Sequence, residues 1–465
     1  MATTSSLGTV SSLGVGSGLD LTGLLSDLKD VEDQKITVIN NQITSYTAKS
    51  TAYDTLASAL GSLSTATEAL TNADIYNSKS VSTNTAFSAA ATSSATTGTY
   101  SINVSQLATA QSLVSTTQSD KSAALSSSDS TLAITVGDTT TNINLTGDQT
   151  SLTSLVSAIN GANAGVTASI IQSGDSRYQL VITSDDTGSA STITVSSTDD
   201  TLNDIIGYDS STGSGAMTEA VSAQDAVLTV NGVTVTRSSN TVTDVPSEGV
   251  TLTLTAVSTS TETLTINEST DDLTTAINDW VTSYNSLIDT FSTLTTYSDD
   301  DDSTNDGALL ADSVLRNIKN KLKSLINSGQ SGDYSVLSQL GISFDTSTGK
   351  LSIDDDALST ALNDNPDAVK TFFAGDGSTT GLATQMVSTI ATYTDEKNGI
   401  ITSAQDGIDE ILERLNTKKT STQARIDAVM ARYTTQFTAL DVLITKLDSI
   451  SSYLDTAFEQ LTSSD

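Results

Sequence analysis

The sequence contains no cysteine and no histidine among its 465 residues. Without cysteine, neither a disulfide framework nor a thiolate nucleophile can form, and without histidine the usual acid–base side chain of neutral pH is missing. Zinc fingers, which draw their metal ligands from these two residue types, are excluded as well. These absences disfavour large classes of enzymes and metal-binding domains.

Basic residues are scarce: 20 Lys and Arg stand against 55 Asp and Glu, which gives a formal net charge of −35. Nucleic acids are excluded as ligands because phosphate binding is driven by basic side chains, and docking on anionic lipid is disfavoured for the same reason. The first basic residue is Lys29, so the basic n-region of a Sec-type signal peptide is absent. No apolar run approaches the roughly 20 residues that cross a bilayer, and no membrane span is predicted.

Proline is also rare, with only Pro246 and Pro366 in the chain. The long Ser/Thr tracts are therefore not a mucin-like stalk, which needs far more proline. They are interpreted as the solvent-facing surfaces of sheets and helices. At 465 residues the chain is too long for a single hydrophobic core, and at least two or three domains are expected.

Apolar residues at both ends of the chain recur with helical spacing. Ser17 and Asp20 form an S-x-x-D helix-start pattern. The apolar positions that follow lie three or four residues apart: Leu21, Leu24, Leu28 and Val31. Near the C-terminus a ladder of residues is spaced seven apart without a miss: Ile426, Tyr433, Leu440, Leu447, Leu454 and Leu461. This repeat is typical of a packed helical seam, so a coiled coil or bundle is predicted in preference to an ordinary core helix.

The middle of the chain follows the period of two that is typical of β-strands. Alternating apolar residues run through residues 86–268, and Asn231-Gly232 separates two such runs as in a type I′ hairpin. Helical spacing returns at Ser269 and continues through Trp280. An α+β multidomain fold is predicted, in which the N- and C-terminal segments form a helical coiled coil or bundle and β-rich domains are inserted between them.

These changes of period also predict the domain boundaries. The expected domains are a terminal helical leg (1–45 with 426–465), a helical bundle (46–85 with 269–425), a β-rich domain (86–120 with 222–268) and a second β-rich domain inserted in the first (121–221).

Motifs for catalysis or metal binding are not found. The acidic run at residues 299–302 lacks a closing Glu at the spacing of a calcium loop, so it is interpreted as a solvated loop. The glycine-rich stretch at residues 14–18 has no lysine and follows no strand, so a flexible tail is favoured over a phosphate loop. Trp280 and the pair Phe372-Phe373 lie within apolar helical stripes and are interpreted as core. No catalytic, cofactor-binding or metal-binding residue is predicted, and the chain is not expected to be an enzyme.

Several motifs follow one another along nearly the whole chain. A glycine-rich N-terminal motif at residues 14–20 includes Gly16, Gly18, Leu19 and Asp20. Further motifs lie at residues 155–188 and 431–454 and, in the helical part, at Trp280 and at residues 284–288, 307–313, 340–342 and 349–354. Taken in order, these segments resemble the filament-capping protein family of bacterial flagella, also called hook-associated protein 2. The segment 155–188 is similar to the family's flagellin hook insert, and the first and last motifs are similar to its terminal signatures.

The resemblance implies a secreted assembly protein without a cofactor. Members of that family leave the cell through the flagellar type III export channel without a cleaved signal peptide and form a ring-shaped homo-oligomer at the filament tip. There they retain exported flagellin and promote its folding and insertion into the growing filament. The implied partners are further copies of the chain, flagellin, the hook–filament junction proteins and, at the C-terminus, a cytoplasmic export chaperone.

On this interpretation the C-terminal ladder and the stripe that begins at Leu21 provide the oligomer and partner contacts. Two other functions fit the same pattern. One is another flagellar axial subunit, since such subunits share helical ends and β-rich insertions. The other is a surface adhesin, whose exposed β domains would bind mucin or host glycans.

Overall fold

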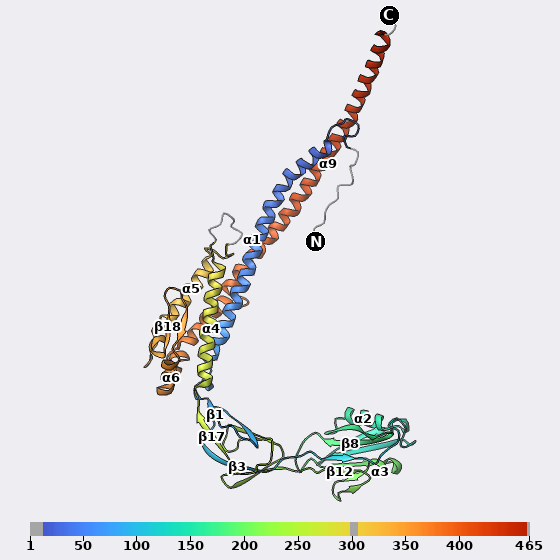
Figure 1. Ribbon diagram of the computed structural model, residues 1–465, viewed down its shortest axis with the longest axis vertical. Helices are drawn as coiled ribbons and strands as arrows, with labels where there is room; N and C mark the ends of the chain where they lie inside the picture. The colour runs from blue at the N-terminus through green and yellow to red at the C-terminus, as the bar shows by residue number, and fades with distance from the viewer. Residues whose placement is uncertain (1–12, 298–305, 463–465) are drawn as a thin grey trace. The chain divides into compact units, whose positions relative to one another are not determined.

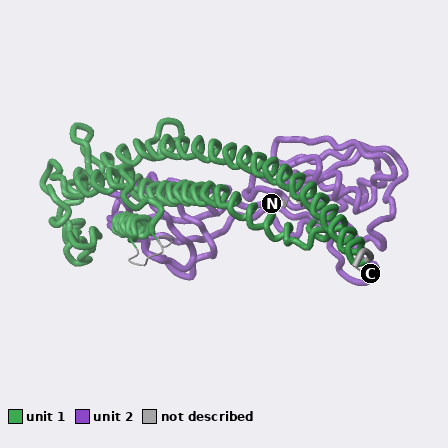
Figure 2. The backbone as a smooth tube through the Cα atoms, turned by 90° about the horizontal axis from the view of Figure 1, so that it is seen from above, with its two compact units in different colours: residues 1–72, 274–465 green, residues 73–273 purple. Residues whose placement is uncertain are grey.

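A computed structural model describes residues 13–297 and 306–462, with side chains described up to residue 459 at the C-terminal end. The chain forms two compact units (Figure 2): residues 1–72 together with 274–465, and residues 73–273. The acidic run at residues 299–302 and the side chain of Leu461 lie outside the described residues. The two terminal segments share one unit and the middle of the chain forms the other, which confirms the predicted α+β arrangement.

The first unit is mainly helical. Its two long helices, α1 (Leu21–Ala69) and α9 (Ile400–Thr462), come from opposite ends of the chain and pack against each other. Tyr53, Leu56 and Leu60 of α1 are almost fully buried because their spacing of three and four places them on one helical face. The other elements of this unit are α4 (Asp271–Leu294), α5 (Ser313–Ile326), the 3₁₀ helix η4 (Leu337–Leu340), β18 (Ile342–Phe344), β19 (Leu351–Ile353), α6 (Asp355–Asp364), α7 (Pro366–Phe373) and α8 (Leu382–Thr394).

Aromatic side chains fill the core of this unit. Trp280 of α4 is 1% exposed and meets Phe373 of α7 edge-on, with ring centroids 5.8 Å apart. Phe372 and Phe373 pack at 84° with ring centroids 5.1 Å apart. Edge-to-face pairs of this kind add about 0.5–1.5 kcal/mol beyond the burial of their area. The interpretation of these three aromatic residues as core is confirmed.

Carboxylate side chains cap the starts of α1, α5 and α6. The Oδ1 atom of Asp20 accepts a hydrogen bond from the backbone N–H of Gly23 at 2.8 Å, so α1 begins after Asp20. The predicted helix is present, but Ser17 does not cap it, because Ser17 donates to a residue of α9 instead. Asp312 and Asp354 cap α5 and α6 in the same way. A carboxylate suits these positions because it satisfies a free N–H group and interacts favourably with the helix dipole.

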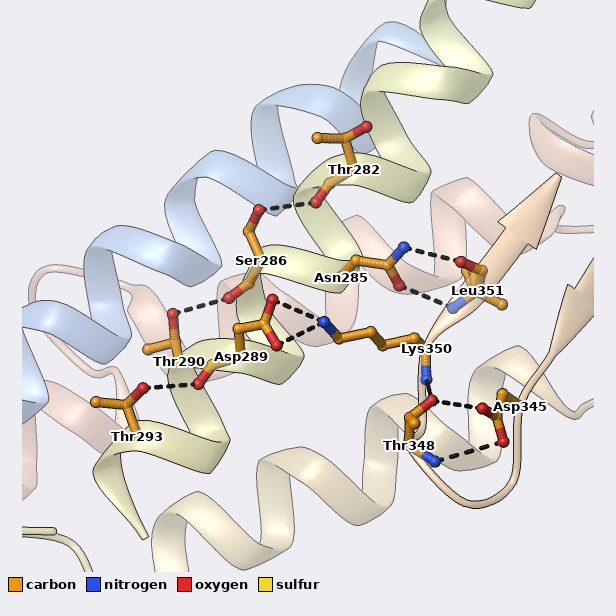
Figure 3. A network of polar contacts seen from close by, with 10 residues as sticks. All are labelled: Thr282, Asn285, Ser286, Asp289, Thr290, Thr293, Asp345, Thr348, Lys350 and Leu351. Carbon is orange, nitrogen blue, oxygen red and sulfur yellow. Dashed lines mark hydrogen bonds and ion pairs between the residues drawn. The ribbon is translucent and has the colours of Figure 1, made fainter. Parts of the chain in front are cut away.

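The hairpin of β18 and β19 is fastened to α4 by polar side chains (Figure 3). Asn285 donates to the carbonyl of Leu351 and accepts from its N–H group, both at 2.8 Å. Lys350 forms an ion pair with Asp289 at 2.6 Å. The carboxylate of Asp345 accepts hydrogen bonds in the turn between the two strands. Asn285 thus satisfies two backbone groups of a short edge strand that would otherwise need water.

The second unit contains two cores built on β-sheets. One core is formed by a sheet with the strand order β1-β17-β3-β13-β14 and a smaller sheet with the order β15-β16-β2. Val230 pairs with Val233 across Asn231 and Gly232, whose φ angles are 49° and 83°, and this confirms the predicted type I′ hairpin. The bounds are η1 (Ala73–Asn77), β1 (Lys79–Val81), β2 (Phe87–Ala91), β3 (Gly98–Gln106), β13 (Ala226–Val230), β14 (Val233–Arg237), β15 (Thr241–Thr243), β16 (Val250–Leu254) and β17 (Glu262–Glu268).

The other core combines sheets of strand order β11-β10-β9-β5-β6 and β12-β4-β8-β7 with two helices. The chain leaves the first core after β3 and returns to it at β13. Thr109 and Gln224 exchange backbone hydrogen bonds of 3.0 and 3.2 Å where the outgoing and returning segments pass each other. The bounds are β4 (Ser112–Val114), β5 (Ser130–Val136), β6 (Thr139–Leu145), η2 (Gly147–Gln149), α2 (Leu152–Gly161), β7 (Val166–Gly174), β8 (Arg177–Ser184), β9 (Ile193–Ser197), α3 (Asp200–Ile206), β10 (Tyr208–Asp209), β11 (Ser214–Gly215) and β12 (Thr218–Val221).

Candidate interface on the terminal helices

The two terminal helices run antiparallel, so the start of α1 lies beside the second half of α9 (Figure 1). Leu25 of α1 packs with Ile426 and Met430 of α9 in a small buried cluster. Further along the pair, the side chain of Gln405 donates to Asp54 at 2.6 Å. Apolar contacts therefore join the two ends of the chain, which is the kind of packing that a seven-residue repeat predicts.

The predicted C-terminal ladder divides into a buried and an exposed part. Ile426 is fully buried, and Tyr433 is half-buried at the edge of the cluster. From Leu440 onward the repeat is exposed, by 39% at Leu440, 55% at Leu447 and 48% at Leu454. Five exposed aliphatic residues at spacings of three and four define the outer stripe of α9: Leu440, Leu443, Leu447, Ile450 and Leu454.

The outer stripe lies where α9 continues past the start of α1 (Figure 1). At about 1.5 Å per residue, the 63 residues of α9 give a helix about 95 Å long. The 49 residues of α1 make a shorter helix, so it does not accompany α9 along its whole length. A continuous apolar face on an exposed helix end is a common mark of a protein–protein interaction site.

The apolar residues predicted on α1 face two ways. Leu21 is 4% exposed and Leu28 packs on the cluster that joins α1 to α9. Leu24 and Val31 are exposed by 47% and 60%, and Val38, seven residues further on, is exposed by 60%. Because Leu24, Val31 and Val38 are seven residues apart, they share one face, which is called here the outer stripe of α1. The helix therefore presents one apolar face to α9 and a second one to solvent.

The N-terminal signature forms a turn that is held on α9. Ser17 donates to the Oδ1 atom of Asp441 from its hydroxyl and from its backbone N–H group, the latter at 2.9 Å. Within the turn, the N–H group of Gly18 donates to the carbonyl of Gly14 at 2.9 Å. The interpretation of residues 14–18 as a flexible tail is therefore wrong. The segment is ordered because its N–H and hydroxyl groups donate hydrogen bonds to a carboxylate of α9.

The four residues predicted in this signature have separate roles. At Gly16 a Cβ atom would collide with the Oγ1 atom of Thr445, so a side chain there would force either Thr445 or the turn to shift. Gly18 has a φ of 68°, a left-handed conformation that glycine adopts without strain. The carbonyl of Leu19 accepts from the second residue after it, at 2.8 Å. Asp20 caps α1. The motif therefore closes the turn and starts the helix.

Hydrogen bonds to the turn lower the pKa of Asp441. The largest contribution comes from the hydroxyl of Ser17, and the backbone N–H groups of Ser17, Gly14 and Gly16 add to it, while partial burial acts in the opposite direction. The carboxylate therefore stays ionised at neutral pH, where it is the acceptor that the turn requires. Asp441 lies within the C-terminal motif at residues 431–454, but the sequence alone does not predict its role, because 424 positions separate it from Ser17.

A second polar cluster holds α1 to the start of α5. Asp312 accepts from the hydroxyl of Tyr53 at 2.9 Å and pairs with Lys49 at 2.9 Å. Burial alone would raise the pKa of Asp312, but the hydrogen bonds from Lys49, the N–H group of Leu315 and Tyr53 outweigh it, and the pKa is lowered. Burial, helped by the bond to Asp312, raises the pKa of Tyr53. The contacts of Asp312 with Lys49 and Tyr53 therefore hold α1 against the start of α5.

The described part of the chain has neither a cluster of metal-ligating side chains nor a membrane-spanning helix. Within it, no group of three or more Asp, Glu, Cys or His side chains is placed to hold a metal ion. None of its helices combines the length and the apolar character that crossing a bilayer requires.

Comparison with known proteins gives the family. The model of the "Flagellar hook-associated protein 2 C-terminus" matches residues 223–449, and that of the "Flagellar hook-associated protein 2 N-terminus" matches residues 17–111. The "Flagellin hook IN motif" matches residues 131–186. The flagellar hook-associated protein 2 of Escherichia coli (strain K12) is 45% identical over 464 residues, which cover 97% of this chain and 99% of that protein. The chain belongs to the flagellar hook-associated protein 2 family.

Two further relatives agree with this assignment. The flagellar hook-associated protein 2 of Salmonella typhimurium (strain LT2) is 39% identical and covers 98% of this chain and 100% of its own. The crystal structure of the D1-D2-D3 domains of the flagellar cap protein FliD from Escherichia coli is 43% identical, covers 77% of this chain and 99% of its own, and superposes with a TM-score of 0.63. The chain is therefore a flagellar filament-cap protein, a structural component outside the cell and not an enzyme.

Proposed function

We propose that this filament-cap protein forms a ring-shaped homo-oligomer at the distal tip of the filament. Beneath the ring it retains exported flagellin and promotes the folding and insertion of each subunit into the growing filament. The family assignment supports a place at the tip. The observation that carries the assembly role is the outer stripe of α9, which is apolar, continuous and exposed.

The outer stripe is large enough to drive a specific contact. Fully burying a leucine-sized side chain contributes roughly 1.5–3 kcal/mol. The five side chains of the stripe are exposed by 39–55%, so covering them contributes on the order of 5 kcal/mol in total. That offsets the lower end of the cost of associating two proteins, about 4–15 kcal/mol. With additional contacts from α1, the terminal helices can hold a partner.

The predicted seam residues divide into two groups under this proposal. The buried and half-buried ones hold the helix pair together: Leu21, Leu28, Ile426 and Tyr433. Those on the outer faces contact partners: Leu24, Val31, Leu440, Leu447 and Leu454. Leu461 continues the same seven-residue repeat in the sequence. The partners are neighbouring copies, flagellin and the hook–filament junction proteins, and a cytoplasmic chaperone covers the C-terminal part before export. The predicted terminal segments (1–45 with 426–465) serve as a leg, and the β-rich region (86–268) serves as the plate of the ring.

Deleting the gene in its native bacterium tests the proposal. Flagellin is measured in the medium and on the cells, in the deletion strain and after complementation. We expect deletion to release flagellin into the medium. The wild-type chain and a control with Ser449→Glu and Ser452→Glu, on the polar side of α9, restore retention. A variant with Leu447→Glu and Leu454→Glu, which adds the same charge to the outer stripe, does not restore it. Normal filaments in the deletion strain would refute the proposed function.

A further inference from the structure

Helix α5 concentrates positive charge in a chain whose formal net charge is −35. Its 14 residues include Arg316, Lys319, Lys321 and Lys323 and no acidic residue, so this one helix carries four of the 20 Lys and Arg of the chain. All four side chains are exposed, because the apolar positions of α5 face the core of the unit. A cluster of positive charge on one helix of a negatively charged protein is a feature that a partner can recognise.

Three of these residues form a row along the helix. Arg316, Lys319 and Lys323 are three, four and seven residues apart, which places them on one face, while Lys321 projects from another side. None of the ion pairs among the described residues includes any of them. Lys323 lies over the ring of Phe344, with its Nζ atom 5.9 Å from the ring centroid. This row, called here the basic face of α5, therefore has no carboxylate partner in the described part of its own subunit.

A complementary row of carboxylates lies on α9. Asp406, Asp409, Glu410 and Glu413 are exposed and share one face, since they are three, four and seven residues apart. Ile408, 5% exposed, marks the opposite, inward side of the helix. These carboxylates, called here the acidic face of α9, also take part in none of the ion pairs among the described residues. Both rows span seven residues, or about 10.5 Å of helix, so their charges match in sign and in spacing.

The two faces do not pair within one subunit. Helix α8 packs against both α5 and α9, and no ion pair among the described residues joins α5 to α9. Two copies of a chain with a net charge of −35 repel each other at long range. A contact between two copies is therefore most favourable where a positive surface of one copy faces a negative surface of the other.

We propose that the basic face of α5 in one subunit docks on the acidic face of α9 in a second copy of this chain. This inference rests on the proposed ring and names one of its contacts. The contact joins two different surfaces, so each subunit offers one face to the neighbour on either side. A head-to-tail contact of this type gives a ring when the rotation from one subunit to the next closes, as the proposed ring requires. A second copy is the favoured occupant because the chain itself carries the matching row of charges.

Charge reversal in the purified full chain tests the contact. One variant carries Arg316→Glu, Lys319→Glu and Lys323→Glu, a second carries Asp406→Lys, Asp409→Lys, Glu410→Lys and Glu413→Lys, and a third carries all seven changes. Lys321→Glu, on the same helix but off the row, is the matched control. Sedimentation velocity at about 50 mM and about 500 mM salt measures self-association, because surface charge pairs are screened at the higher salt.

We expect each reversal alone to weaken self-association at low salt by roughly tenfold or more, while the control stays within about twofold of wild type. The seven-residue variant, which exchanges the two charges, regains association, and so does a mixture of the first two variants. High salt weakens wild-type association and reduces the differences among variants. Restoration by the exchange shows that the single reversals do not act by unfolding the chain.

Two results would overturn the contact. One is self-association that does not respond to either reversal, and the other is failure of the exchanged variant to regain it. If the basic-face variant self-associates normally but no longer binds added flagellin, flagellin is the occupant and the contact between copies is wrong. The proposed cap function is judged separately, by flagellin retention on cells. If deletion still releases flagellin while the reversals leave self-association intact, the function stands and only the contact fails.

Discussion

Ile426 and Leu447 occupy equivalent positions in the seven-residue repeat of α9, yet the tertiary structure gives them different surroundings. Ile426 is fully buried against Leu25 and Met430, whereas Leu447 is 55% exposed. Ile426→Ala removes buried methyl groups and leaves a cavity, which costs about 2–4 kcal/mol. The better helix propensity of alanine offsets at most about 0.7 kcal/mol of this. Leu447→Ala leaves no cavity, and we expect it to change the stability of the subunit by about 0.5 kcal/mol or less.

Amide hydrogen exchange of the full chain, followed by mass spectrometry, measures this difference locally. Because a factor of ten corresponds to about 1.4 kcal/mol, Ile426→Ala should accelerate exchange in peptides from residues 420–433 by roughly 10- to 700-fold after the helix-propensity offset. Leu447→Ala should leave these peptides unchanged. Equal acceleration by the two substitutions, or none by Ile426→Ala, would refute the view that this cluster holds α1 to α9.

Three further outcomes are expected. Gly16→Ala brings a Cβ atom into collision with the Oγ1 atom of Thr445, so exchange in residues 13–20 should rise, and unchanged protection would contradict the close approach of the turn to α9. Asn285→Ala removes two hydrogen bonds to Leu351; at about 0.5–1.5 kcal/mol for each bond it should lower the unfolding midpoint in urea, and an unchanged midpoint would contradict the fastening role. Asp312 has a folded-state pKa below its usual value, so the stability it contributes is complete above about pH 4 and is lost as the pH falls through the lowered pKa. The melting temperature of Asp312→Asn should therefore lie below that of the wild type at pH 7, and the gap should narrow as the pH falls below about 4. A gap independent of pH would refute this account.

Local backbone requirements explain which parts of the fold could be predicted. Asn231-Gly232 predicted its hairpin because few residues other than Asn and Gly accept the positive φ angles of a type I′ turn. Trp280 and Phe373 were predicted as core because they lie within apolar stripes at helical spacing. The cap of α1 was misplaced at Ser17, because a serine can bond to any acceptor within reach. Its acceptor is Asp441, which only the folded chain brings close.

The helical ends, the β-rich middle and, through the ordered motifs, the family could all be predicted from the residues alone. These properties depend on spacings of two to seven residues and on short segments, which a sequence displays directly. Which positions of the ladder are buried could be learned only from the folded chain. Ile426 lies beside α1, while Leu447 lies where α9 has passed the first turn of that helix. The repeat is the same at both places, but burial differs because it depends on where the neighbouring helix ends. Contacts between residues hundreds of positions apart set that end.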